Sequence, residues 1–179
     1  MVLQTKLMTI QEFKEFVERP ENSDKLFELI NGGIIEVSPS RTRNSEIGFI
    51  LGYAVYKFSE ENNFPCHIST GDGAYDIQGH VVAPDFAYKP TPMSDDYPDP
   101  VAPLWTAQVI SPTDKATDIR NKQQVYRDAK ILYWEMYPQQ QLIDIYEHGR
   151  EKRTVGIDDT LDGGEVLPGF TIAAKVLFQ

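Results

Sequence analysis

The sequence predicts a mixed α/β protein in which a mixed β-sheet is flanked by helices. Apolar residues recur at helical spacing in the segments 9–20, 40–60 and about 114–130. Short apolar runs bounded by turn residues separate these segments and predict strands. The 179 residues fit one domain, so residues 1–179 are expected to fold around a single core.

The first fifty residues predict a helix followed by a β-hairpin. Thr9 followed by Glu12 is a capping-box pattern at a helix start, and Pro20 marks the helix end. The runs 26–30 and 34–37 are apolar and are separated by Asn31-Gly32, the dipeptide that favours a tight hairpin turn. A second amphipathic helix is expected over 40–60.

The rest of the chain predicts further strands and one more helix. Strands are expected at 66–70, 74–77, 85–88 and 104–110, with a proline- and aspartate-rich exposed loop over 91–103. A helix follows to about residue 130, and then a hairpin-like pair, 131–137 and 141–146, with Pro138 in the turn. The fragment 167–170 is expected to precede a last short strand or helix.

Charge and cysteine content restrict the possible functions. The net charge of −10 argues against a surface that is basic all over, as nucleic-acid-binding domains usually have. Residues 111–130 have five basic and three acidic side chains, a local net of +2 that a solvated helix face explains equally well. The single cysteine, Cys66, excludes an internal disulfide and a cysteine-based zinc site. No apolar run is long enough to span a bilayer and no signal pattern is present, so we expect a cytoplasmic location.

Four polar side chains stand out in or beside apolar segments. Asp85 follows Pro84 at a strand start, and Gln108 is one of the few polar residues of the strand 104–110. Glu28 lies inside an apolar strand, where an unpaired carboxylate is costly. Lys122 shares one helix face with Asp118 and Tyr126, because the three are four residues apart. Carboxylate and amide oxygens suit Mg²⁺ or Mn²⁺, and a nearby lysine suits phosphodiester hydrolysis.

Seven fragments, in order and with compatible spacing, together resemble one family. They are Glu28-Leu29-Ile30-Asn31-Gly32, Ser38-Pro39, Val82-Ala83-Pro84-Asp85, Val109-Ile110-Ser111-Pro112, Asp118/Lys122/Tyr126, Tyr133-Trp134 and Leu167-Pro168-Gly169-Phe170. The chain resembles the Uma2 (DUF820) family of the PD-(D/E)XK superfamily over roughly residues 8–178. The resemblance implies a restriction-endonuclease-like core and a metal-dependent endonuclease that hydrolyses DNA.

The resemblance also implies a role for each of the four side chains. Asp85 would be the metal-binding aspartate, Glu28 the N-terminal acidic residue and Lys122 the catalytic lysine, placed on the helix because Ile110 fills the usual strand position. Gln108 stands where the family typically has glutamate. Asp85, Gln108 and Glu28 would thus surround Mg²⁺ or Mn²⁺, which we expect to bind weakly because the amide lacks a charge. A homodimer is the expected assembly.

Each of these residues also has a structural interpretation. Asp85 fits a turn cap, and Gln108 fits a buried amide bonded to backbone. Lys122 fits an ion pair with Asp118, and Glu28 fits a contact with Lys25 or with a nearby helix N-terminus. The alternative function is therefore a catalytically inactive relative that binds DNA or protein as a homo-oligomer, with the aromatic hairpin after residue 130 as one candidate contact.

Overall fold

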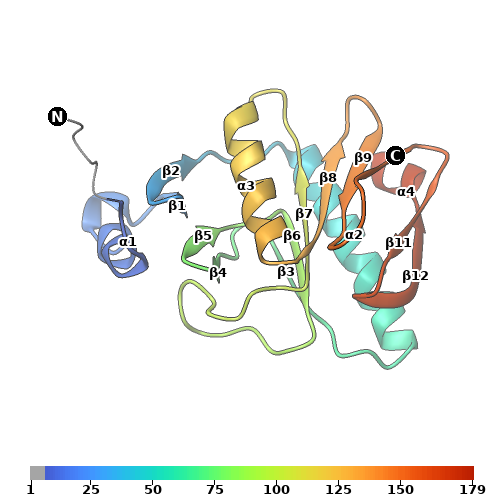
Figure 1. Ribbon diagram of the computed structural model, residues 1–179, viewed down its shortest axis with the longest axis horizontal. Coiled ribbons are helices and arrows are strands. Elements are labelled where there is room, and N and C mark those ends of the chain that lie inside the picture. The colour runs from blue at the N-terminus through green and yellow to red at the C-terminus, as the bar shows by residue number, and fades with distance from the viewer. Residues whose placement is uncertain (1–6) are drawn as a thin grey trace.

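The computed structural model describes residues 7–179 and has two main sheets with helices packed against them (Figure 1). A six-stranded sheet has the order β10-β9-β8-β7-β6-β3, a four-stranded sheet the order β2-β1-β5-β4, and β11 pairs with β12. The helices are α1 (Ile10–Val17), the 3-10 turn η1 (Pro20–Asn22), α2 (Thr42–Glu61), α3 (Ala116–Asp128) and α4 (Ala174–Phe178). The strands are β1 (Leu26–Ile30), β2 (Gly33–Val37), β3 (His67–Thr70), β4 (Tyr75–Ile77), β5 (His80–Val82), β6 (Phe86–Lys89), β7 (Trp105–Val109), β8 (Leu132–Tyr137), β9 (Leu142–Tyr146), β10 (Arg153–Gly156), β11 (Thr160–Gly163) and β12 (Leu167–Ala173).

The N-terminal helix and hairpin form as the sequence predicts. The Thr9 side chain and the Glu12 side chain each bond the other's backbone N–H, which completes the capping box at the start of α1. Asn31 and Gly32 have φ values of 51° and 71°, the left-handed conformation that a two-residue hairpin turn requires. Ile30 therefore pairs with Gly33, and β1 is placed against β2.

The two faces of the six-stranded sheet bury different side chains. Strands β7 and β8 are parallel, and α3 connects them and packs on one face. The opposite face, covered by α2 and α4, carries Trp105 and Trp134, whose ring centroids lie 4.6 Å apart in an edge-on contact. Because side chains alternate along a strand, Gln108 and Tyr133 lie on the α3 face. The two faces thus separate an apolar core from the candidate functional residues.

Three strands were not predicted, and one fragment lies inside a strand. β10 and β11 each contain one large apolar side chain, Val155 and Leu161, and β5 only Val81 and Val82, too few for an apolar run to predict a strand. The fragment 167–170 precedes the last short helix, α4, as expected, but it is itself the first part of β12. The register shifts there, since Leu167 pairs with Gly163 and Thr171 with Asp162.

Two of the aromatic residues in the hairpin β8–β9, which was expected to offer a contact between copies, lie in the interior of the protein. Tyr133 and Trp134 have no exposed side-chain surface, because they pack against α3 and α2 of the same chain. These two residues are therefore unavailable to a partner.

Within residues 7–179, no helix is both long and apolar enough to cross a membrane.

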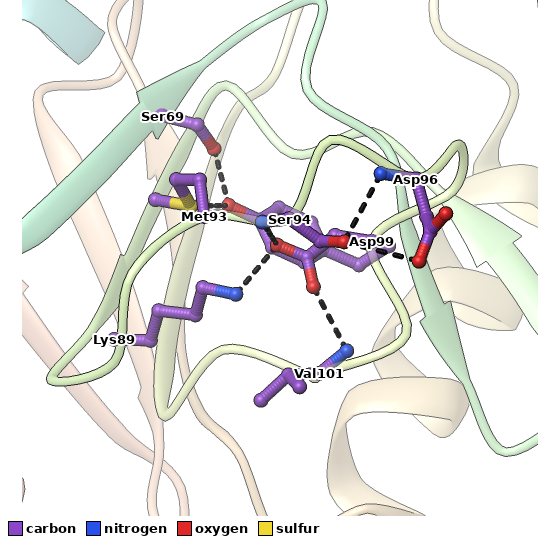
Figure 2. Close-up of polar contacts among 8 residues, drawn as sticks. Ser69, Lys89, Met93, Ser94, Asp96, Asp99 and Val101 are labelled. Atoms are coloured by element: carbon purple, nitrogen blue, oxygen red, sulfur yellow. Dashed lines mark hydrogen bonds and ion pairs between the residues drawn. The ribbon is translucent and has the colours of Figure 1, made fainter.

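The loop between β6 and β7 is fixed by a buried ion pair. Lys89 and Asp99 are 1% and 7% exposed, and the lysine ammonium bonds the carboxylate directly. The same carboxylate accepts the backbone N–H groups of Ser94 (3.1 Å) and Val101 (2.9 Å), as Figure 2 shows. These bonds hold the pKa of Asp99 below its ordinary value even though burial opposes them. The Asp99 carboxylate therefore holds together the part of the loop from Ser94 to Val101.

We expect Asp99→Asn to destabilise the protein strongly, because it leaves the Lys89 ammonium buried without a counter-charge. The expected loss is about 3–5 kcal/mol in the free energy of unfolding, measured by urea denaturation. Asp95→Asn, at an exposed position in the same loop, is the matched control and should change it by less than about 0.5 kcal/mol. Equal stability of the two variants would contradict this account of the ion pair.

Candidate active site

Asp85 lies in the three-residue link that joins β5 to β6. Its Oδ2 accepts the backbone N–H of Val109 at 2.7 Å, at the end of β7, where β6 no longer provides a pairing partner. Helix α2 packs tightly on this link: a Cβ on Gly48 would lie 2.8 Å from the backbone oxygen of Asp85. The Asn44 amide of the same helix donates to the Val109 oxygen at 3.1 Å. The Asp85 carboxylate is therefore held in a fixed position.

Burial raises the pKa of Asp85 to about 6. The Val109 N–H and the positive charge of Lys122 oppose this shift, whereas the negative charges of Asp114 and Glu28 add to it. A carboxyl with this pKa is ionised at neutral pH but at a cost in free energy. Such a cost is typical of functional carboxylates and is not expected for a simple turn cap.

Glu28 joins two strands and a helix in the interior. Its side chain is 1% exposed; Oε1 accepts the Ala83 backbone N–H at 2.9 Å, and Oε2 lies 2.8 Å from the Lys122 ammonium. Lys122 therefore pairs with Glu28 rather than with Asp118, and Lys25 instead lies 3.9 Å from Glu36. Both structural interpretations that paired these residues with near neighbours are thereby excluded for the described chain.

Gln108 lies in β7 beneath helix α3. Its Nε2 donates long hydrogen bonds to the Ala83 oxygen (3.5 Å) and to the Tyr126 hydroxyl (3.4 Å). Tyr126 is fully buried, and burial raises the pKa of its phenol. With its nitrogen directed toward these two oxygens, the amide keeps Oε1 as an acceptor with no protein donor assigned to it.

The four predicted residues thus converge on one short segment. Ala83 bonds Glu28 through its N–H and Gln108 through its oxygen, and Asp85 follows two residues later. Lys122, on α3, pairs with Glu28 and so lies beside the same segment. The segments involved are up to 94 positions apart, so only the tertiary fold brings them together.

The donor set fits a weakly held divalent cation. Within residues 7–179, no three His, Cys, Asp or Glu side chains lie in a metal-binding arrangement. Glu28 Oε1 accepts a backbone N–H, and its Oε2 lies in the ion pair with Lys122 without a hydrogen bond. Mg²⁺ is commonly held by one or two carboxylates together with water and substrate phosphate, and here Asp85 is the carboxylate with one oxygen outside the Val109 bond.

Sequence reasoning missed a second buried glutamate next to Gln108. Glu135 pairs with Gln108 in the parallel register of β7 and β8 and is 2% exposed. The hydroxyls of Tyr137 (2.8 Å) and Tyr146 (3.2 Å) donate to its Oε2, and Gln123 donates to its Oε1 at 3.4 Å. Burial raises the pKa of Glu135. An acidic residue within the apolar run of β8 was the available signal, the same one that identified Glu28.

We expect Asp85→Asn to stabilise the protein at alkaline pH. A pKa of about 6 in the folded state exceeds the unfolded value of about 3.9, so the wild type loses stability as pH rises through this interval. The neutral variant should be more stable by about 3 kcal/mol at pH 8 and equal to the wild type below about pH 3. Thermal unfolding at both pH values measures this difference. A variant less stable than the wild type at pH 8 would show that the charge itself stabilises the fold.

Comparison with known proteins shows the family of the chain. A solved structure, described as a putative nuclease belonging to DUF820 from Anabaena variabilis, superposes with a TM-score of 0.78 at 17% identity. The match covers 96% of this chain and 97% of that one, and at this identity it establishes the fold. No curated protein sequence matches. The family model Uma2, described as "Putative restriction endonuclease", matches residues 13–175, and the chain therefore belongs to the Uma2 nuclease family.

Proposed function

We propose that this protein is a metal-dependent endonuclease that hydrolyses phosphodiester bonds of DNA with a weakly bound Mg²⁺ or Mn²⁺. The convergence of Asp85, Gln108, Glu28 and Lys122 on the link after β5 is the observation that carries this proposal. Membership of the Uma2 family gives the reaction class. DNA as the substrate is part of the proposal.

Asp85 and the Gln108 amide oxygen hold the cation in this proposal, with water and a substrate phosphate completing its coordination. A divalent cation in such a place polarises the phosphate and lowers the pKa of water. Glu28 has a different role from the one expected for it: it positions Lys122 through their 2.8 Å ion pair. The Lys122 ammonium then orients the attacking water and offsets negative charge that develops on the phosphate.

The neutral side chain at position 108 limits the affinity for the cation. At an effective dielectric constant of 20, a unit-charge pair 4 Å apart contributes about 4 kcal/mol, and a dication doubles this before desolvation is subtracted. Gln108 lacks that charge and keeps only an oxygen ligand. A working site of this composition depends on substrate phosphate to retain the cation.

The test is nicking of supercoiled plasmid with Mn²⁺, with wild type, Asp85→Ala and Gln108→Glu prepared identically. We expect slow nicking by the wild type, none by Asp85→Ala, and at least about tenfold faster nicking by Gln108→Glu at limiting Mn²⁺. The Tyr126 hydroxyl can donate to the new carboxylate, which offsets part of the repulsion that this charge adds to the site. Gln140→Glu, in the exposed turn after β8, is the matched control and should behave as the wild type.

The same experiment separates the proposal from an inactive nuclease fold that serves in binding. The neutral Gln108 and the net charge of −10 favour this alternative. No nicking by the wild type together with nicking by Gln108→Glu would identify a scaffold whose chemistry lacks one charge. No nicking by either protein, and no Mn²⁺ binding at millimolar concentration, would overturn the endonuclease assignment.

A further inference from the structure

The loop of residues 90–104 is a rigid part of the molecule that borders the candidate active site. The backbone of Asp99 pairs with β4, since its N–H donates to Ala74 and its oxygen accepts from Asp76, each at 2.9 Å. Together with the bonds that the Asp99 carboxylate makes, shown in Figure 2, these contacts fix both the side chain and the backbone of the loop. The apex of the loop therefore has a defined position.

Two observations place this loop on the face from which Glu28 projects. Asp99 extends the four-stranded sheet beyond β4, so β4 and β5 lie between it and the Glu28 strand. Met93 and Ala102, at the two ends of the loop, pack against the cluster that contains Ile30, Tyr75 and Tyr126. Because Ile30 and Glu28 are two residues apart on β1, they share this face. The loop is thus a wall of the site.

Tyr97 is the aromatic residue that this wall exposes. Its side chain is 40% exposed and lies two residues before the anchored Asp99. Partial burial, and then the negative charge of Glu28, raise the pKa of its phenol, so the ring stays neutral at physiological pH. The proposed hydrolysis, as described above, gives no role to an exposed aromatic side chain.

The charges next to Tyr97 determine which part of a nucleic acid it contacts. Asp95 and Asp96 are both exposed and acidic, so they repel a phosphate backbone. The same carboxylates accept hydrogen bonds from the amino groups of bases. A neutral ring flanked by acceptors therefore suits the face of a base that is not paired in a duplex.

We propose that Tyr97 is a substrate-binding residue on which an unpaired base of the nucleic acid stacks while an adjacent phosphate occupies the Asp85–Lys122 site. The proposal rests on the proposed function and specifies its substrate as a strand with at least one unstacked nucleotide next to the cleavage point. The Lys89–Asp99 ion pair fixes the loop two residues from Tyr97, which reduces the cost of ordering the loop backbone on binding.

The experiment uses single-stranded oligonucleotides with 2-aminopurine at successive positions, in Ca²⁺ so that binding is measured without turnover. Stacking on an aromatic side chain quenches the emission of this base. Wild type and Tyr97→Phe should quench it at one position, whereas Tyr97→Ala and Tyr97→Leu should not. The dissociation constant of these two variants should be about tenfold higher or more. Tyr53→Ala, at a 59%-exposed tyrosine on α2, is the matched control and should bind and quench as the wild type.

Plasmid nicking by the same proteins separates the two proposals. Binding and quenching that Tyr97→Ala retains would overturn the stacking role, whatever the nicking activity. Weaker binding by Tyr97→Phe, equal to that of Tyr97→Ala, would assign the contact to the hydroxyl and also overturn it. Position-specific quenching by a wild type that does not nick would uphold Tyr97 and refute hydrolysis. A wild type that neither binds nor nicks would refute both.

Discussion

The buried carboxylate of Glu28 is the constraint on which the candidate site depends. A charge that is 1% exposed must be paired, and its two partners come from distant segments, the link after β5 and the helix α3. The Ala83 N–H fixes the small sheet to the link that carries Asp85, and Lys122 fixes α3 over it. The position of the Asp85 link, the charge balance of the site and the position of Lys122 all depend on the Glu28 side chain.

Asp85 and Gln108 determine how much negative charge the rest of the site carries. Ionised Asp85 is already disfavoured by burial and by the charges of Glu28 and Asp114, so a third carboxylate at position 108 would add to the repulsion in the absence of a cation. The glutamine removes this repulsion and also the attraction that a cation would gain. In this chain, the stability of the empty site and its affinity for metal are therefore opposed.

Much of the fold follows from local patterns, whereas the site requires the tertiary structure. The Asn31-Gly32 turn, the capping box of α1 and the helical spacing of Ile47, Leu51 and Val55 each have a local physical cause, and each predicted element is present. The short strands β5, β10 and β11 lack such a cause. For the site, the sequence identified the residue types, and the family resemblance identified the positions. The pairing of Glu28 with Lys122 was not predicted, because nothing local distinguishes Lys122 from the other lysines. Tyr97, proposed above to bind substrate, does not stand out in the sequence, because its segment has the composition of a proline- and aspartate-rich connecting loop.

The separation of aromatic residues between the two faces of the large sheet has a spectroscopic consequence. The chain has two tryptophans, both buried in the core on the α2 side of the sheet and in contact with each other, and Trp105 also contacts Phe86 and Phe170. Across the sheet, Tyr126 of α3 packs against Tyr133 of β8. Tyrosine absorbance does not separate the two faces, because Tyr88 belongs to the core face and Tyr53 and Tyr56 lie on α2. Intrinsic tryptophan emission, in contrast, arises from the core face alone and therefore reports the integrity of the scaffold.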